Sequence, residues 1–170
     1  MQEVNIRLKL TQPSLGFIKR KVGSGNDVIY AMPRDCQQRV MFLASWWFER
    51  MQYAAKVLGR CYNDITNIAW ATHIDGPLGQ WKRTILQPDQ KKRARYALHE
   101  AFRPGVVIGV TAVIPDGITI DDLRELLQIV GTYKGVSPYQ SPTEIFGTFE
   151  VVSVMPTIRT AKPQVRSPVT

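Results

Sequence analysis

The sequence predicts an α+β fold in which two helices cover one face of an antiparallel sheet, in the order strand–helix–strand–strand–helix–strand. An alternating pattern opens the chain, a long helical pattern follows, and a β-branched run precedes a second helix and a last strand. A length of 170 residues with 44% hydrophobic content suits one folded domain with a sizeable core. We expect this domain to span residues 1–155 and an extended basic arm to occupy 156–170.

The first strand and the helix after it have the clearest patterns. Residues 4–10 alternate apolar and polar side chains, which is typical of a strand with one buried face. From Asp35 to Gly59, apolar residues recur at spacings of three and four and predict a helix of about 25 residues. Asp35 is expected to cap its start and Gly59 to end it. Trp46 and Trp47 point to adjacent sides of this helix, so at least one belongs to the core.

The middle of the chain is harder to assign. Residues 65–71 suit a strand, and the second half of 87–102 contains helix-forming residues. Residues 106–114 form a nearly continuous β-branched run, which is expected of a central strand covered on both faces. This middle part would supply the second strand of the sheet together with an insertion.

The C-terminal elements complete the pattern. Asp121 and Asp122 suit the positive end of a helix over 119–130, and Gly131 is expected to end it. Residues 145–154 predict the last strand. The combined order is that of a ferredoxin-like βαββαβ domain, with an insertion in the middle and an extended C-terminal arm.

The two cysteines, Cys36 and Cys61, are predicted to be buried free thiols. They flank the long predicted helix, whose ends lie roughly 35 Å apart, whereas a disulfide needs its Cα atoms within about 7 Å. Free thiols fit a reducing compartment. The N-terminus lacks the features of a signal peptide, and no apolar run is long enough to span a membrane. We therefore expect a cytoplasmic protein without membrane contact.

The net charge of +8 is unevenly distributed along the chain. Residues 1–115 carry a net charge of +9, residues 116–150 carry −4, and the last twenty residues carry +3. A basic body with a short acidic segment favours a polyanionic partner and indicates which part of the chain faces it.

The densest basic cluster lies within residues 82–103, where seven cations face only Asp89 and Glu100. Lysine and arginine supply sequence-independent affinity for nucleic acid, and interleaved aromatic side chains supply stacking. The alternative interpretation is a solvated helix face. We single out Trp81 as a stacking residue and, as phosphate-binding candidates, Lys82, Arg83, Lys91, Lys92, Arg93 and Arg95.

A second basic segment is Lys19-Arg20-Lys21, which has glycines on either side. We interpret it as a basic loop, a flexible glycine-flanked hairpin that could fold over a bound strand. The alternative is an ordinary soluble loop tip.

The glycine-rich segment 131–139 is the most specific local feature. Glycines let backbone N–H groups approach a phosphate, Lys134 supplies charge, and tyrosines can stack on bases. The alternative is an ordinary connection between a helix and a strand. The candidate ligands of nucleic acid here are Tyr133, Lys134, Gly135 and Tyr139.

A ferredoxin-like domain whose last helix leads through a glycine-rich loop into an aromatic–glycine–aromatic strand resembles the RAMP superfamily, the RNA-binding proteins of CRISPR systems. The matching residues are Gly131, Gly135, Phe146, Gly147 and Phe149. The opening strand 4–10, with Pro13 and Gly16 after it, also resembles how those proteins begin. The resemblance implies that RNA is held by the loop and by the groove between sheet and helix.

The preferred hypothesis is a non-enzymatic binder of RNA or single-stranded DNA within a larger ribonucleoprotein, viral or defence assembly, without cofactor or metal. One alternative is an interaction or inhibitor protein, such as a viral one, that docks on a larger complex through its basic arm. Another is a metal-independent ribonuclease with His73 as general base and Lys82 or Tyr62 as its partner.

Overall fold

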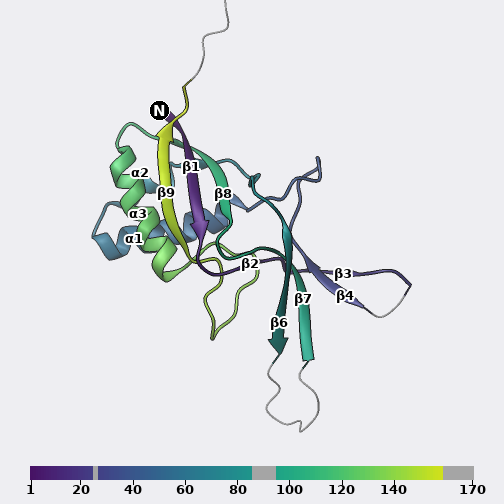
Figure 1. Cartoon of the computed structure of the whole chain (residues 1–170). Coiled ribbons are helices and arrows are strands. Elements are labelled where there is room, and N and C mark those ends of the chain that lie inside the picture. Colours follow the sequence, from purple (N-terminus) through teal and green to yellow (C-terminus); the bar gives the residue numbers. More distant parts are fainter. Residues whose placement is uncertain (25–26, 86–94, 159–170) are drawn as a thin grey trace, which may run out of the picture.

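The structure is a computed structural model that describes residues 1–24, 27–85 and 95–158. Its main sheet has four antiparallel strands in the order β5–β8–β1–β9. Taken with α1 (Ala44–Leu58) and α3 (Ile120–Tyr133), which lie on one face of the sheet (Figure 1), these strands give the chain order βαββαβ. The predicted ferredoxin-like fold is therefore confirmed. The strands are β1 (Gln2–Leu10), β5 (Ala69–Trp70), β8 (Val107–Ile114) and β9 (Phe149–Pro156).

The hydrophobic core lies between the main sheet and its helices. Alternate residues of β1 are buried, as predicted, and Trp47 of α1 stacks on Trp70 of β5 with ring centroids 4.5 Å apart. β8 is central, but it alternates between buried and partly exposed residues. Its second face is less covered than the apolar run predicts, because both long helices pack on the same side of the sheet.

The start of α3 is fixed by side chains. Thr119 and Asp122 form a capping box, in which each side chain bonds the other residue's backbone N–H. Arg60 also pairs with Asp122 and with Glu125. The hydrogen bonds from Arg60 and Thr119 lower the pKa of Asp122 to about 2.

Acid is expected to remove the contribution of Asp122 to stability. Its pKa falls from an ordinary 3.8 to about 2 on folding, so the contribution is present above pH 4 and is lost as the pH falls towards 2. The variant Asp122→Asn should be less stable at neutral pH and should lose less stability between pH 4 and 2, measured by urea unfolding. The exposed neighbour substitution Asp121→Asn is the control. A wild-type acid profile for Asp122→Asn would contradict the assignment.

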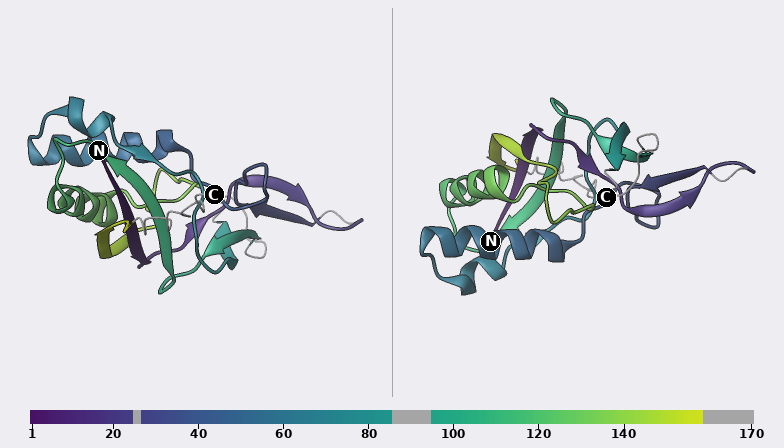
Figure 2. Two further views of the ribbon diagram at one scale, coloured as in Figure 1. Left: turned by 90° about the horizontal axis from the view of Figure 1, so that it is seen from above. Right: turned by 90° about the horizontal axis from the view of Figure 1, so that it is seen from below.

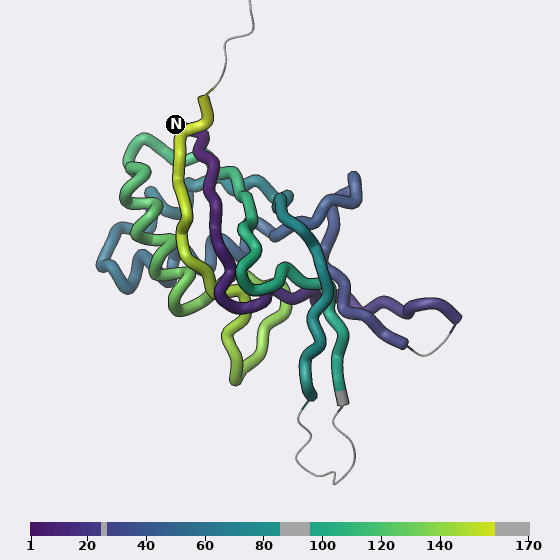
Figure 3. Tube along the Cα trace, viewed as in Figure 1, coloured from purple at the N-terminus to yellow at the C-terminus, as the bar shows by residue number. Residues whose placement is uncertain are grey.

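A second sheet is built from two insertions, one between β1 and α1 and the other between β5 and β8 (Figures 1 and 3). Its central strand is β7, which pairs antiparallel with β6 and β2 and parallel with β4. β3 completes the sheet as the partner of β4 in a hairpin that extends away from the helices (Figure 2). The elements are β2 (Ser14–Leu15), β3 (Ile18–Lys21), β4 (Val28–Ala31), β6 (Gly79–Ile85) and β7 (Arg95–Phe102).

The long helix is shorter than predicted. α1 begins at Ala44, and Asp35 instead closes a turn by accepting hydrogen bonds from the backbone N–H groups of Gln37 and Arg39. Val40, counted in the helical stripe, is buried in extended backbone. The predicted end is confirmed, because Gly59 adopts φ 66° and caps α1.

Three other boundaries differ from the prediction. Residues 95–102 form strand β7 and not a helix, because they pair with strands from both insertions. The 65–71 segment is divided between α2 (Tyr62–Thr66) and the short β5. Gly131 lies inside α3, where it allows close contact with β9: a Cβ atom at this position would be 2.3 Å from the Phe149 carbonyl oxygen.

Both cysteines are free, but both are exposed, so the prediction of buried thiols is wrong. Cys36 lies in the turn that Asp35 closes, and Cys61 directly precedes α2. Neither position lies in α1.

Candidate nucleic-acid interface

The second sheet presents two faces with different side chains. Directly paired residues share a face of a sheet, so the registers Lys19–Tyr30, Tyr30–His99 and Trp81–His99 place these residues on one face. We call it the loop-side face, because Tyr139 of the loop after α3 packs on it. The opposite surface, the far face, carries Arg20, Ile29, Lys82, Tyr96 and Leu98.

Lys19-Arg20-Lys21 is part of a hairpin, as predicted, but the three cations lie in strand β3 of that hairpin and not in its loop. Pairing with β4 orders this strand. All three side chains are exposed. Because strand residues alternate, Lys19 and Lys21 lie on the loop-side face and Arg20 lies on the far face.

Arg83 connects the second sheet to the loop after α3. Its guanidinium lies over the Tyr139 ring, 4.6 Å from the centroid, and its Nε donates to His99 Nε2 at 3.3 Å. Because Nε2 accepts, the imidazole proton is on Nδ1, which donates to the Gly16 carbonyl at 2.7 Å. Tyr30 stacks on the same imidazole at 4.9 Å. Arg83 is thus held by one buried histidine and one loop tyrosine.

His99 is fully buried and is uncharged in this network. Burial lowers the pKa of His99 below its ordinary value of 6.5, and the charge of Arg83 lowers it further, although the hydrogen bond to Gly16 opposes both effects. A neutral His99 is what allows Nε2 to accept from Arg83.

The far face combines cations with exposed apolar side chains. Lys82 Nζ lies 4.0 Å from the centroid of the Tyr96 ring, and Tyr96 is 54% exposed. Leu98 beside it is also exposed. Trp81, the predicted stacking residue, is partly buried and lies on the other face, opposite His99.

The glycine-rich loop is hydrogen-bonded to strand β2. Ser137 accepts a hydrogen bond from the Leu15 backbone N–H at 2.9 Å, and the Tyr139 N–H donates to the Leu15 carbonyl. Gly135 and Gly147, both with positive φ, lie against each other's chain segments. The loop is therefore a fixed structure that places Tyr139 against β7.

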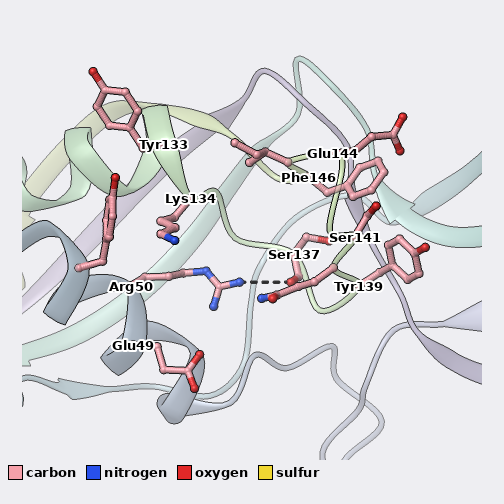
Figure 4. A pocket seen from close by; sticks show the side chains of 12 residues that line it. Glu49, Arg50, Tyr133, Lys134, Ser137, Tyr139, Ser141, Glu144 and Phe146 are labelled. Atoms are coloured by element: carbon pink, nitrogen blue, oxygen red, sulfur yellow. Dashed lines mark hydrogen bonds between the residues drawn. The ribbon is translucent and has the colours of Figure 1, made fainter.

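A cavity of about 320 Å³ lies between α1, the end of α3 and this loop (Figure 4). Arg50 of α1 is only 6% exposed and donates to the carbonyls of Gly135, Trp46 and Ser137. Burial lowers the pKa of the Arg50 guanidinium. Lys134 also lines the cavity, with Nζ 4.4 Å from the centroid of the Tyr53 ring.

The structure brings together part of the predicted site. Tyr133, Lys134 and Tyr139 line the cavity, and Gly135 contributes its carbonyl to Arg50. Lys19, Lys21, Trp81 and Arg83 share the loop-side face, whereas Arg20 and Lys82 lie on the far face. Lys91, Lys92 and Arg93 lie outside the described residues, and Arg95 begins β7.

Two residues of this region were missed by the sequence interpretation. Arg50 occurs within a helical pattern, where a single cation usually indicates a solvated face. His99 lies within the basic cluster of residues 82–103, but the sequence interpretation did not single it out. The strand alternation of Ala97, His99 and Ala101, all buried, was the available signal that His99 points inward.

His73 is located apart from these features. It bridges to Met41, and its Nε2 lies 3.7 Å from Asp75. Its proposed partners lie on other elements: Lys82 contacts Tyr96 in the second sheet, and Tyr62 begins α2.

Within the described residues, no helix is long and apolar enough to cross a membrane. No known protein family matches the chain, and no curated protein matches it.

The fold is similar to that of a chain in the cryo-EM structure of the type III-B Cmr-beta complex bound to cognate target RNA. The TM-score is 0.59 and the identity is 12%, over 91% of this chain and 60% of that chain, so this chain spans less than two thirds of that one. A chain of a CRISPR RNA-guided surveillance complex matches with a TM-score of 0.38 and 12% identity, over 89% of this chain and 67% of that chain, a score too low to show a shared fold. The predicted resemblance to RAMP proteins of CRISPR systems is thus confirmed at the level of the fold.

Proposed function

We propose that this protein binds single-stranded RNA without cleaving it, as one subunit of a larger ribonucleoprotein assembly. The loop-side face would follow the RNA backbone, with Lys19, Lys21 and Arg83 contacting phosphates. Trp81 and Tyr139 are the aromatic groups on which bases would stack. The fold shared with a chain of an RNA-bound complex supports the proposal but does not by itself indicate RNA binding.

The observation that carries the proposal is the set of cations without carboxylate partners on the second sheet. Among the described residues, Lys19, Lys21 and Arg83 make no ion pair, whereas Arg39, Arg60 and Arg124 each pair with a carboxylate. Cations on one surface repel one another, so they destabilise the folded state unless a polyanion binds. Phosphates of a nucleic acid would remove that cost.

Removal of two of these charges is expected to weaken RNA binding. The double variant Lys19→Gln/Lys21→Gln should bind a single-stranded RNA about tenfold more weakly at low salt, in fluorescence anisotropy. Each lost phosphate contact should reduce the slope of log K against log salt by about 0.7. The matched control is Arg39→Gln/Arg124→Gln, which also removes two charges but only from ion-paired arginines.

A second pair of variants tests which face binds. Arg20→Gln/Lys82→Gln removes two cations from the far face and should change affinity less than the loop-side pair does. A larger loss for the far-face pair would overturn the assigned face. Wild-type affinity in both pairs, or no RNA binding at low salt, would overturn the proposed function.

A further inference from the structure

The cavity between α1 and the loop after α3 contains a buried cation, Arg50, that has no ion-pair partner within hydrogen-bonding distance among the described residues. The Arg50 guanidinium donates to three carbonyl oxygens, and no ion pair is formed by Arg50 among the described residues. Carbonyl dipoles satisfy the hydrogen bonds of the guanidinium, and the charge of Glu49 offsets the effect of burial on the Arg50 pKa only in part, so a cost of burying the charge remains. Arg50 therefore favours an anion in the space that it lines.

A second cation reaches the same cavity. Lys134 follows α3, and its ammonium is supported by the Tyr53 ring. Figure 4 shows the ends of Arg50 and Lys134 at the same end of the cavity. Two cations from different elements, one of them a planar guanidinium, suit a phosphate, which carries several acceptor oxygens.

The rest of the lining suits a nucleoside attached to that phosphate. Tyr133, Tyr139 and Phe146 offer aromatic surface, and the volume of about 320 Å³ is at the small end of ligand sites. Glu49 and Glu144 are exposed at the cavity. Carboxylates accept hydrogen bonds from ribose hydroxyl groups, which a free inorganic phosphate lacks.

We propose that this cavity binds a ribonucleoside monophosphate, with the phosphate between Arg50 and Lys134 and the nucleoside against Tyr139 and Phe146, which lie on the same side of the cavity in Figure 4. The ligand is a phosphate monoester, either free or at the end of an RNA strand. The second case rests on the proposed RNA binding, and the first does not.

Calorimetric titration of the full chain with adenosine 5′-monophosphate, adenosine and inorganic phosphate tests the site. The monophosphate should bind at least about tenfold more tightly than adenosine or inorganic phosphate, because a charge-assisted hydrogen bond discriminates by about this factor. Lys134→Ala should remove most of this preference and leave adenosine binding unchanged. Arg50 also holds the loop in place, so Lys134 is the residue to replace. Lys56→Ala, an exposed lysine of α1, is the matched control.

Equal binding of the monophosphate and adenosine, absence of monophosphate binding, or wild-type preference in Lys134→Ala would each overturn the site. The source of the ligand is distinguished by RNA oligonucleotides with a phosphate or a hydroxyl at the 5′ end. Tighter binding of the phosphorylated strand identifies a strand end, and a preference seen with the free monophosphate alone identifies a free nucleotide. The variant Lys19→Gln/Lys21→Gln should weaken binding of the RNA strand that ends in a hydroxyl group but should not weaken binding of the monophosphate. Failure of the proposed RNA binding can therefore be distinguished from failure of the proposed nucleotide site.

Discussion

Replacement of Gly147 by alanine is expected to lower the free energy of unfolding by roughly 3 kcal/mol and the melting temperature by about 10 °C. Gly147 has φ +70°, and a Cβ atom would be 2.1 Å from the Val136 carbonyl oxygen. The energetic costs of the left-handed backbone and of the steric overlap therefore add. The atoms nearest to the added Cβ belong to the backbone of Val136 and Ser137, so they cannot move away as the end of a flexible side chain could. Thermal and urea unfolding measure the loss.

Gly59→Ala separates the two contributions. Gly59 has nearly the same backbone angle, φ +66°, but a Cβ atom there meets nothing within 4 Å. It should cost only the backbone term of about 1 kcal/mol. Equal losses in the two variants would show that the contact between Gly147 and Val136 does not constrain the loop. The Gly147 variant should also lose nucleotide binding at the cavity, because the loop carries Tyr139 and Phe146.

Trp47→Ala is expected to destabilise the protein by about 3–5 kcal/mol. Trp47 is 1% exposed, and its ring lies almost parallel to Trp70, with an angle of 8° between the planes. Truncation removes this stacking and leaves a cavity between α1 and β5 that the surrounding core cannot fill. Urea unfolding followed by circular dichroism measures the change, since the variant also alters tryptophan fluorescence.

Phe48→Ala is the matched control for Trp47. Phe48 is the next residue of the same helix but is 38% exposed, so its truncation should change stability by no more than about 0.5 kcal/mol. Trp47→Phe should recover part of the loss by retaining an aromatic ring. If Trp47→Ala and Phe48→Ala were equally stable, the stacked pair would not be a main element of the core.

The elements predicted correctly from the sequence are those whose pattern and burial agree. β1 alternates in sequence and in burial, and the apolar side of α3, with Leu123, Leu126 and Leu127, is buried as its spacing predicts. Each pattern is local, and the apolar face that it predicts is the face buried between the sheet and the helices. The order of these elements was sufficient to predict the ferredoxin-like fold.

The errors occur where distant residues decide the structure. Asp35 has the residue type of a helix cap, but here its carboxylate binds backbone N–H groups of a turn, and Phe42 enters the core without a helix. The helix-forming composition of β7 is overridden by pairing with strands from both insertions. Composition describes local preference, whereas these pairings depend on segments far away in the chain.

The candidate site was predicted as a set of residue types and not as an arrangement. Lys134 and Tyr139 were recognised from the glycine-rich segment, but their partners Tyr53 and Arg83 come from other elements. Arg50 could not be identified, because its burial depends on a loop that folds over α1. A sequence pattern contains no information on such a contact.

The central position of β7 in the second sheet has an evolutionary consequence. The β3–β4 hairpin arises from one insertion and the β6–β7 hairpin from the other, and the parallel β4–β7 pairing joins them. Deletion of residues 79–102 would leave β4 with an open edge and β2 without its partner, and an isolated hairpin is at best marginally stable. Homologous proteins are therefore expected to have gained or lost the two insertions together, so a natural variant that keeps only one should have found another strand to cover the exposed edge.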